Sequence, residues 1–393
     1  MAERMSAPDL SGRTILYLVS EDWYFLSHRL PLARAAREAG ARVVVATRIN
    51  DDRATLEAEG FAVAPIPFDR SGLNPIADLK TLAEIRRVYQ RERPDLVHQV
   101  AMKPTLYGTL AALMTGVPQV VNAMAGMGFL FISQGLKARL LRPAIRGAMG
   151  WLNRRAQVSV IVQNDDDRAL FRDLLGVSDR KIATIRGSGV DVDALRPAEP
   201  PPISDDRPPV ALCLSRMLWD KGIGELVEAA RLLGARGVPL TVRLVGPSDA
   251  NPAAIPRETI EAWVAEGLVE AAGKTRDVAG EYARSHIAVL PSYREGLPKS
   301  LLEAAACGRP IVATDAPGCR EVCVEGETGL RVPVRAVEPL ADALERLARD
   351  ATLRAQMGQA ARRLAEERFS IDRIVAETLA LYDATLREPS PPQ

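Results

Sequence analysis

The chain is poor in the residues that hold metals and disulfides. It has three histidines, at positions 28, 98 and 286, and no CxxC pair among its four cysteines, Cys213, Cys307, Cys319 and Cys323. Histidines scattered in this way argue against a His/Cys metal site. The cysteines are expected to be reduced and partly buried. The sequence therefore predicts no resident metal or other cofactor.

A signal peptide and a strong net charge are also missing. Residues 1–6 contain no apolar core, and the net charge is only +1, so we expect a cytoplasmic protein. No G-x-G-x-x-G follows the first predicted strand, residues 14–19, which argues against a dinucleotide-binding protein. The 393 residues, 47% of them hydrophobic, exceed one ordinary core, so two domains of about 190 residues each are expected.

Apolar strands alternate with helical segments in both halves, which predicts two doubly wound parallel α/β units. The predicted strands are residues 14–19, 42–46, 62–66, 96–99, 119–122, 158–162 and 182–185, then 209–214, 241–245 and 286–290. Five prolines between residues 192 and 208 cannot continue a helix or a central strand. We therefore expect an N-terminal domain (1–191), a linker (192–208) beside the active site, a C-terminal domain (209–370) and a C-terminal helix and tail (371–393).

The most informative motif is a pair of glutamates, Glu295 and Glu303, on either side of a Gly-Leu-Pro turn. An apolar run precedes the turn and a helical segment follows it. Pro298 suits the first helical position, where its missing N–H is not needed. The site predicted at this helix start is one for phosphate, bound by backbone N–H groups and the positive end of the helix dipole. Those N–H groups belong to Lys299, Ser300 and Leu301.

A second motif follows the predicted strand 209–214. Arg216 stands at the strand's carboxyl end and Lys221 at the start of the next helix, which aims both cations at the crevice where open α/β sheets bind ligands. A bidentate Arg and a point-charge Lys suit a pyrophosphate. Two further positions are expected near the same ligand, Gly246 after strand 241–245 and Val278 at a helix start.

Together these motifs resemble the donor site of retaining glycosyltransferases of family 4. That family has the GT-B fold, two Rossmann-like domains that face a cleft. The resemblance implies that Glu303 holds the ribose of a nucleotide sugar and that Glu295 lies near the sugar. It also implies that Arg216 and Lys221 bind the donor diphosphate and stabilise it as it leaves, without a divalent metal.

Two N-terminal segments, residues 22–31 and 95–104, resemble a bacterial branch of the family. That branch acts on polyprenyl-diphosphate-linked oligosaccharides and includes N-acetylgalactosaminyltransferases. The resemblance implies a UDP-sugar donor such as UDP-GalNAc and an undecaprenyl-diphosphate-linked acceptor. His28, His98 and Lys103 are expected at strand ends facing the cleft, although a core or surface role remains open for each. The Gly-Gly loop of many relatives is replaced here by residues 21–24.

Residues 96–164 contain no Asp or Glu and seven Lys or Arg, a net charge of +7. Within this stretch, residues 127–151 combine large apolar side chains with cations, which is typical of a helix that lies on an anionic membrane surface. With the lipid-linked acceptor that the resemblance implies, this surface is expected to bind peripherally at the inner face of the cytoplasmic membrane. The side chains expected on this surface are Lys137, Arg139, Arg142, Arg146 and Trp151.

Other interpretations of these patterns remain open. The uncharged run 104–136 could be a transmembrane span, but its glycines and the helix stop at residues 116–118 argue against this. The basic stretch could be an ordinary surface or bind nucleic acid, although aromatic residues are sparse. The same scaffold could serve a sugar-nucleotide epimerase, a glycosyltransferase with a soluble acceptor, or a non-catalytic lipid-binding protein.

Overall fold

The computed structural model describes residues 8–69, 74–124, 136–155, 157–248 and 253–388, except for the side chains of 136–141. Contacts divide the chain into two compact units, one of Met1–Ser188 with Asp372–Gln393 and one of Gly189–Ile371. The segment expected as a linker, residues 192–208, thus belongs to the second unit. The C-terminal helix belongs to the first.

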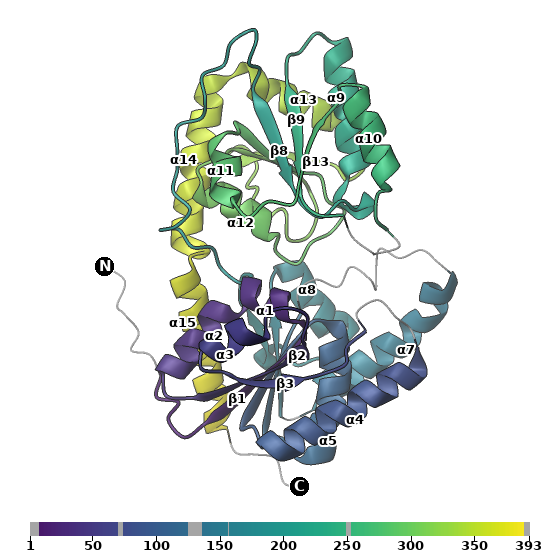
Figure 1. Cartoon of the computed structure of the whole chain (residues 1–393), viewed down its shortest axis with the longest axis vertical. Helices are drawn as coiled ribbons and strands as arrows, with labels where there is room; N and C mark the ends of the chain where they lie inside the picture. The colour runs from purple at the N-terminus through teal and green to yellow at the C-terminus, as the bar shows by residue number, and fades with distance from the viewer. Residues whose placement is uncertain (1–7, 70–73, 125–135, 156, 249–252, 389–393) are drawn as a thin grey trace. The chain divides into compact units, whose positions relative to one another are not determined.

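The first unit is built on a seven-stranded parallel sheet in the order β3-β2-β1-β4-β5-β6-β7. Strands β1, β2 and β3 of this sheet are labelled in Figure 1. Every strand predicted for this half is present, with ends within two residues of those expected. The order reverses between β1 and β4, which are neighbours in the sheet. The strands are β1 (Thr14–Glu21), β2 (Arg42–Arg48), β3 (Ala62–Pro65), β4 (Leu96–Val100), β5 (Gln119–Ala123), β6 (Val158–Val162) and β7 (Ile182–Thr184).

Helices cover both faces of this sheet, because alternate residues of its strands enter different cores. Leu16 and Leu18 of β1 pack with α4 (Pro75–Glu92) and α5 (Thr109–Thr115). Ile15 and Tyr17 enter the other core, with α2 (Leu30–Glu38) and α15 (Ile371–Arg387). The remaining helical segments are α1 (Asp22–His28), α3 (Arg53–Ala58), η1 (Pro104–Gly108), α7 (Leu136–Asn153), α8 (Asp165–Ala169), η2 (Leu170–Leu174) and η3 (Asp179–Lys181).

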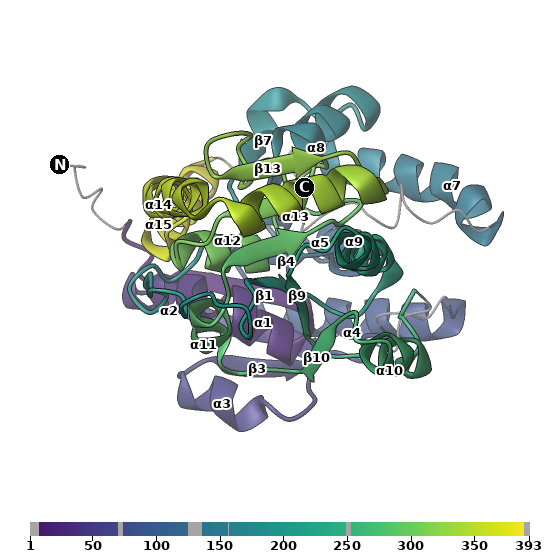
Figure 2. The ribbon, with the colours of Figure 1, turned by 90° about the horizontal axis from the view of Figure 1, so that it is seen from above.

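The second unit has a six-stranded parallel sheet in the order β10-β9-β8-β11-β12-β13. Its strands are β8 (Val210–Leu214), β9 (Thr241–Val245), β10 (Glu270–Gly273), β11 (Ile287–Leu290), β12 (Ile311–Thr314) and β13 (Gly329–Val332). Helix α12 (Lys299–Ala306) packs beside α14 (Ala351–Arg368), as Figure 2 shows, and α9 (Ile223–Ala235) packs on α13 (Val337–Arg349). The segments η4 (Trp219–Lys221), α10 (Arg257–Ala265) and α11 (Val278–Ala283) complete the unit.

Residues 192–208 contain neither a helix nor an extended strand, as their prolines predict. Hydrogen bonds to their backbone carbonyl groups nevertheless hold them against the second unit. The guanidinium of Arg362 donates to the carbonyls of Val192 and Leu195, at 2.9 and 2.7 Å, and His286 Nε2 lies 2.9 Å from the carbonyl of Pro201. This segment is therefore an irregular part of the second unit that packs on its surface.

Three smaller expectations concern cysteines, one helix end and the membrane. All four cysteines are buried, and none is paired with another cysteine. Helix α5 stops at Gly116, which is left-handed (φ 72°), and buried β5 follows, as the sequence indicates. Among the described residues, none of the helices combines the length and the apolar character needed to cross a membrane.

Candidate donor site

The predicted donor-site residues gather at the carboxyl edge of the second sheet. Strands β8 and β11 are neighbours, and the strand order reverses between them. The loops that follow these two strands therefore open on the crevice where open α/β sheets bind ligands. Arg216 and Lys221 lie on the first loop and Glu295 on the second, so the structure brings the two motifs together within one unit.

A direct ion pair joins the two loops. Lys221 Nζ lies 2.5 Å from Glu295 Oε1, and the two side chains are 15% and 13% exposed. Ser292 Oγ donates to the same carboxylate oxygen at 2.6 Å. The hydroxyl also lies 3.2 Å from the carbonyl of Asp220, which accepts the backbone N–H of Tyr293 at 2.9 Å. The half-buried Arg216 stands five residues before Lys221 on the same loop.

Glycine is required where these loops cross. Gly222 has φ +70°, and a Cβ there would lie 2.1 Å from the carbonyl oxygen of Pro291. A Cβ on Gly246, after β9, would lie 1.8 Å from the carbonyl oxygen of Ser215. Such close approaches exclude any side chain. Gly246, expected near the ligand, thus has a structural role in holding the loop that carries Arg216.

The start of α12 differs from the prediction in two details. Pro298 precedes the helix as its N-cap residue, with φ −72° and ψ 115°, and the helix begins at Lys299. The N–H of Leu301 donates to the carbonyl of Pro298 at 3.0 Å, and its side chain is buried. The prediction that this N–H is available to bind phosphate was wrong, because a tight first turn satisfies it within the chain. The carbonyl of Ser300 accepts the hydroxyl of Tyr282 at 2.5 Å, which anchors the first turn.

Glu303 is a buried carboxylate in the second turn of α12, 8% exposed. Burial raises the pKa of Glu303, and the ammonium of Lys299, 3.7 Å from its Oε1, partly opposes that rise. A carboxylate buried in this way destabilises the folded protein unless further hydrogen bonds replace its hydration. Hydroxyl groups of a bound ligand can supply them. Val278 opens α11, as expected, but it packs against the core.

Comparisons with known proteins agree with the division of the chain into two units. The family "Glycosyl transferases group 1" matches residues 208–350, and the family "Glycosyl transferase 4-like" matches residues 14–164. The chain belongs to the family 4 glycosyltransferases. Solved structures agree on the GT-B fold. Sucrose-phosphate synthase from Thermosynechococcus elongatus matches with a TM-score of 0.79 at 20% identity, covering 95% of this chain and 98% of that one.

Two further relatives carry information on ligands. An Anabaena protein, HepE, solved in complex with UDP, matches with a TM-score of 0.72 at 18% identity over 95% of this glycosyltransferase and 100% of its own chain. A Campylobacter jejuni enzyme is 29% identical over 92% of this chain and 98% of its own. It is named N,N'-diacetylbacillosaminyl-diphospho-undecaprenol alpha-1,3-N-acetylgalactosaminyltransferase.

In the first unit of the glycosyltransferase, the three residues expected at strand ends have different surroundings. His28 ends α1, half-buried, with its ring stacked on Tyr24 at 4.1 Å between centroids. Lys103, after β4, lies 3.1 Å from Asp78 Oδ1. His98 is the middle residue of β4 and is fully buried, so its expected place at a strand end was wrong. The strand that contains it extends one residue further than predicted.

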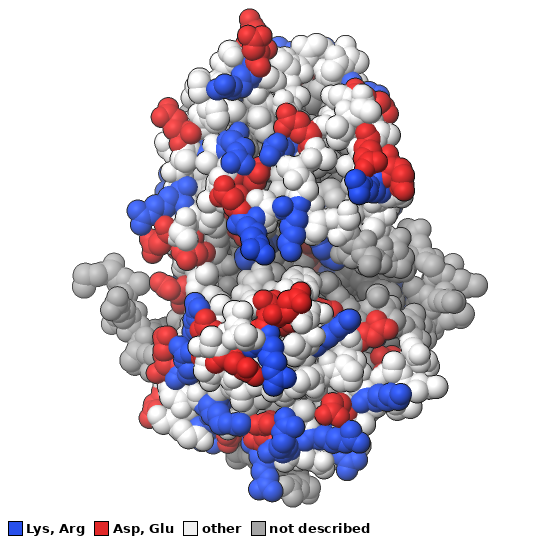
Figure 3. Space-filling model, viewed as in Figure 1, with Lys and Arg blue, Asp and Glu red and all other residues white. Residues whose placement is uncertain are grey.

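The expected membrane surface of the glycosyltransferase lies only partly within the described residues. The loop 127–135 and the side chains of Lys137 and Arg139 lie outside them. On α7, Arg146 and Trp151 are exposed, and Arg142 is half-buried. Figure 3 shows Lys and Arg interspersed with Asp and Glu on the visible face of each unit.

Sequence reasoning missed the residues that position the charged groups of the donor site. Ser292 precedes Glu295 by three residues, a spacing with no recognisable pattern. Gly318, with φ +78°, brings the loop after β12 against this segment, where a Cβ would lie 2.5 Å from the carbonyl of Gly296. Across the described ranges, no three His, Cys, Asp or Glu side chains gather in a metal-binding arrangement.

Proposed function

We propose that the enzyme transfers a hexose or N-acetylhexosamine from a UDP-sugar, such as UDP-GalNAc, to an undecaprenyl-diphosphate-linked oligosaccharide. The anomeric configuration of the sugar is retained. Support for the donor comes from the cationic crevice of the second unit and from the UDP complex of HepE. Support for the acceptor comes from the name of the Campylobacter jejuni relative, which specifies a diphospho-undecaprenol substrate.

The observation that carries this proposal is the convergence of Arg216, Lys221 and Glu295 at the β8–β11 reversal, next to the start of α12. Arg216 and Lys221 hold the donor diphosphate. Glu303 accepts hydrogen bonds from ribose hydroxyls, which compensate its burial. Glu295 already accepts from Lys221 and Ser292, so its position is fixed before a donor arrives. It orients the sugar over the diphosphate.

In the proposed reaction, the bond between the anomeric carbon and the β-phosphate oxygen breaks. The acceptor hydroxyl forms its new bond to that carbon on the same face, and its proton passes to the departing phosphate oxygen. Negative charge therefore grows on the diphosphate as the transition state is reached. Lys221 and Arg216 stabilise that charge in a position set before reaction. The proposal assigns no step to a divalent metal or to a protein nucleophile.

The acceptor requires an enzyme that works at a membrane. We infer that α7, with the exposed Arg146 and Trp151, docks on the inner face of the cytoplasmic membrane. Each Lys or Arg near an anionic leaflet contributes about 1 kcal/mol. Trp151, under the guanidinium of Arg155 at 3.9 Å, is the kind of amphipathic side chain found at such interfaces.

Thermal unfolding with nucleotide sugars tests the donor assignment. A ligand that binds only the folded protein stabilises it by about 2.7 kcal/mol at a hundred times its Kd. We expect UDP-sugars, rather than GDP- or dTDP-sugars, to raise the unfolding midpoint of the wild type and of Lys274→Met. Lys274 is an exposed lysine of the same unit and serves as a control.

The variant Lys221→Met should lose most of this stabilisation. If UDP-sugar stabilises it as strongly as the control, the donor site is placed wrongly. An epimerase would convert UDP-sugar and release free sugar without an acceptor. A glycosyltransferase consumes the donor only when an acceptor is present, so incubation with UDP-sugar alone separates the two activities.

A further inference from the structure

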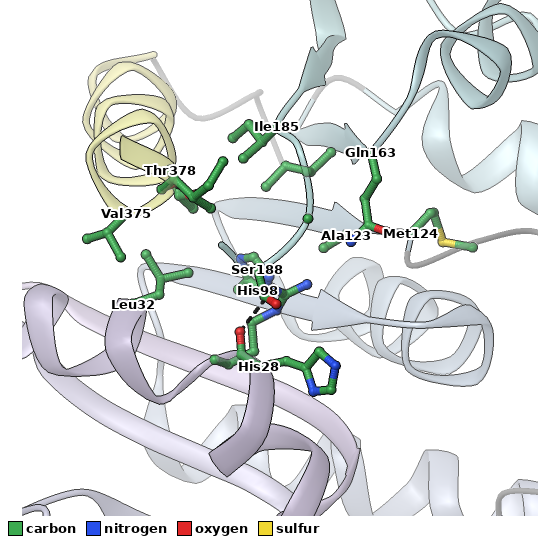
Figure 4. Close-up of a pocket in the computed structure, with 14 residues that line it drawn as sticks. His28, Leu32, His98, Ala123, Met124, Gln163, Ile185, Ser188, Val375 and Thr378 are labelled. Atoms are coloured by element: carbon green, nitrogen blue, oxygen red, sulfur yellow. Dashed lines mark hydrogen bonds between the residues drawn. The ribbon is translucent and has the colours of Figure 1, made fainter. Parts of the chain in front are cut away.

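A small pocket in the first unit has a lining that the donor site does not explain. It lies toward the carboxyl ends of the parallel strands, under residues 185–188 and beside α15 (Figure 4). Two of its lining residues are His98, on β4, and Gln163, which directly follows β6. Among the described residues, no Asp or Glu lines it. Its polar lining residues are His28, Arg29, His98, Gln163, Ser188 and Thr378.

Arg29 is a buried cation without an anionic partner in the part of the chain that the structure describes. It is 6% exposed, and its guanidinium donates one hydrogen bond, from Nη1 to the carbonyl of His28 at 3.2 Å. Its Nε is buried without a hydrogen-bond partner, and within the described residues no carboxylate pairs with it. An unpaired buried charge costs several kcal/mol. Arg29 lies between α1 and α2, so the negative end of one helix dipole and the positive end of the other meet at this residue.

His98 adds a second unsatisfied nitrogen to the same lining. Its Nδ1 lies 2.7 Å from the hydroxyl of Tyr382, while its Nε2 is buried with no partner among the described residues. Burial, and to a smaller extent the charge of Arg29, hold the pKa of His98 well below its ordinary range, so the ring is neutral. The hydroxyl of Tyr382 has two acceptors within reach, His98 Nδ1 at 2.7 Å and the hydroxyl of Tyr17 at 3.4 Å. In the tautomer that accepts the shorter of these bonds, the proton of the ring is on Nε2, which is then a donor.

We propose that this pocket binds an oxygen of a phosphate-class anion through Arg29 Nε and His98 Nε2. The free volume is about 20 Å³, close to that of one water molecule, so one ligand oxygen enters and the rest of the group stays outside. The assignment of this anion to the lipid-linked acceptor rests on the proposed function. Binding of free phosphate does not, because the chemistry of the pocket is the same for both sources.

The test uses the full-length protein and inorganic phosphate at constant ionic strength. We expect phosphate to raise the thermal unfolding midpoint of the wild type, and Arg29→Met to abolish this rise. In phosphate-free buffer the Arg29→Met midpoint should stay the same or increase, because the unpaired charge is gone. An arginine with a purely structural role would give a decrease. Arg34→Met is the matched control, since Arg34, on the helix that Arg29 precedes, pairs with Glu59.

Phosphate could also occupy the proposed diphosphate site, and Lys221→Met separates the two sites. We expect the phosphate response to persist in Lys221→Met, to weaken at least fivefold in affinity in His98→Phe, and to vanish in Arg29→Met. Equal responses in Arg29→Met and in the wild type would overturn the proposal. So would stabilisation by chloride alone, which would indicate a general salt effect.

A short-chain prenyl-diphosphate-linked sugar distinguishes the two sources of phosphate. It should compete with inorganic phosphate in the wild type, whereas the same sugar without phosphate should not. Phosphate binding without such competition would overturn the assignment to the acceptor. Donor binding is a separate readout, because Arg29→Met should keep its stabilisation by UDP-sugar. Failure of the anion site and failure of the proposed donor site would therefore be seen in different measurements.

Discussion

Replacing Glu303 by Gln should weaken donor binding without harming the fold. Glutamine keeps the size of the side chain and one acceptor oxygen but removes the charge. Hydrogen bonds to charged groups contribute about 1.5 to 3 kcal/mol, which corresponds to a loss of roughly 10- to 150-fold in affinity for the UDP-sugar. Isothermal titration of wild type and variant with the same UDP-sugar measures this loss.

In the absence of donor, Glu303→Gln should be at least as stable as the wild type. Burial raises the pKa of Glu303 in the folded state. A carboxyl group of this kind contributes stability below its unfolded pKa, and that contribution is lost as the pH rises through the folded pKa. At neutral pH the buried charge of Glu303 lowers the stability of the wild type, whereas the side chain of Glu303→Gln carries no charge. The donor-free midpoint of the variant should therefore equal or exceed that of the wild type, and the difference should shrink as the pH is lowered toward 4.

Glu281→Gln is a matched control in the same unit. Glu281 is also buried, but Arg243 Nε lies 2.8 Å from its Oε2 and Arg284 Nη1 lies 2.7 Å from its Oε1. Removing its charge should lower the unfolding midpoint and leave donor affinity unchanged. If Glu303→Gln instead binds the donor like the wild type, or is destabilised as Glu281→Gln is, Glu303 is a structural residue and the ribose assignment is refuted.

Three further predictions concern turnover, metal and membrane. Arg216→Ala and Lys221→Ala should each reduce transfer at least about a hundredfold, measured as kcat with saturating donor, with a smaller effect on the unfolding midpoint; wild-type rates would exclude both from the diphosphate site. Transfer should persist in excess EDTA, and complete loss restored by Mg²⁺ or Mn²⁺ would show that a metal carries the leaving group. Vesicles with anionic lipid should bind the enzyme, and should bind less of it as the salt concentration rises, because charges are screened beyond about 8 Å at physiological ionic strength. The double variant Arg142→Glu/Arg146→Glu should no longer bind these vesicles, and equal binding of the wild type to neutral vesicles would contradict docking.

Most of the first sheet could be predicted because its strands are continuous apolar runs bounded by turns. Strand β6, Val158–Val162, has the predicted bounds. The second sheet was predicted less completely. Its strands β10, β12 and β13 were missed, although β3, β7 and β11, which are equally short or shorter, were predicted. Strand β10 is exposed along its whole length, so it lacks the apolar pattern by which a buried strand is recognised.

The chemistry of the donor site was predicted better than its detailed contacts. The motifs indicated that Lys221 and Glu295 share one crevice, but the residues are 74 positions apart, and their direct pairing depends on how two loops cross. The helix start at Pro298 was misplaced by one residue because proline is also compatible with the N-cap conformation. The partner of His98, Tyr382, comes from the far end of the chain, and no local pattern could have indicated it.

The most direct test of the proposed reaction is a transfer assay analysed by mass spectrometry. Purified enzyme is incubated with a panel of UDP-sugars and an undecaprenyl-diphosphate-linked saccharide. We predict that the mass of the lipid-linked glycan increases by one hexose or N-acetylhexosamine, that UDP is released in equal amount, and that Lys221→Met abolishes both. Consumption of UDP-sugar without acceptor, or an unchanged lipid-linked glycan with every donor, would contradict the assignment.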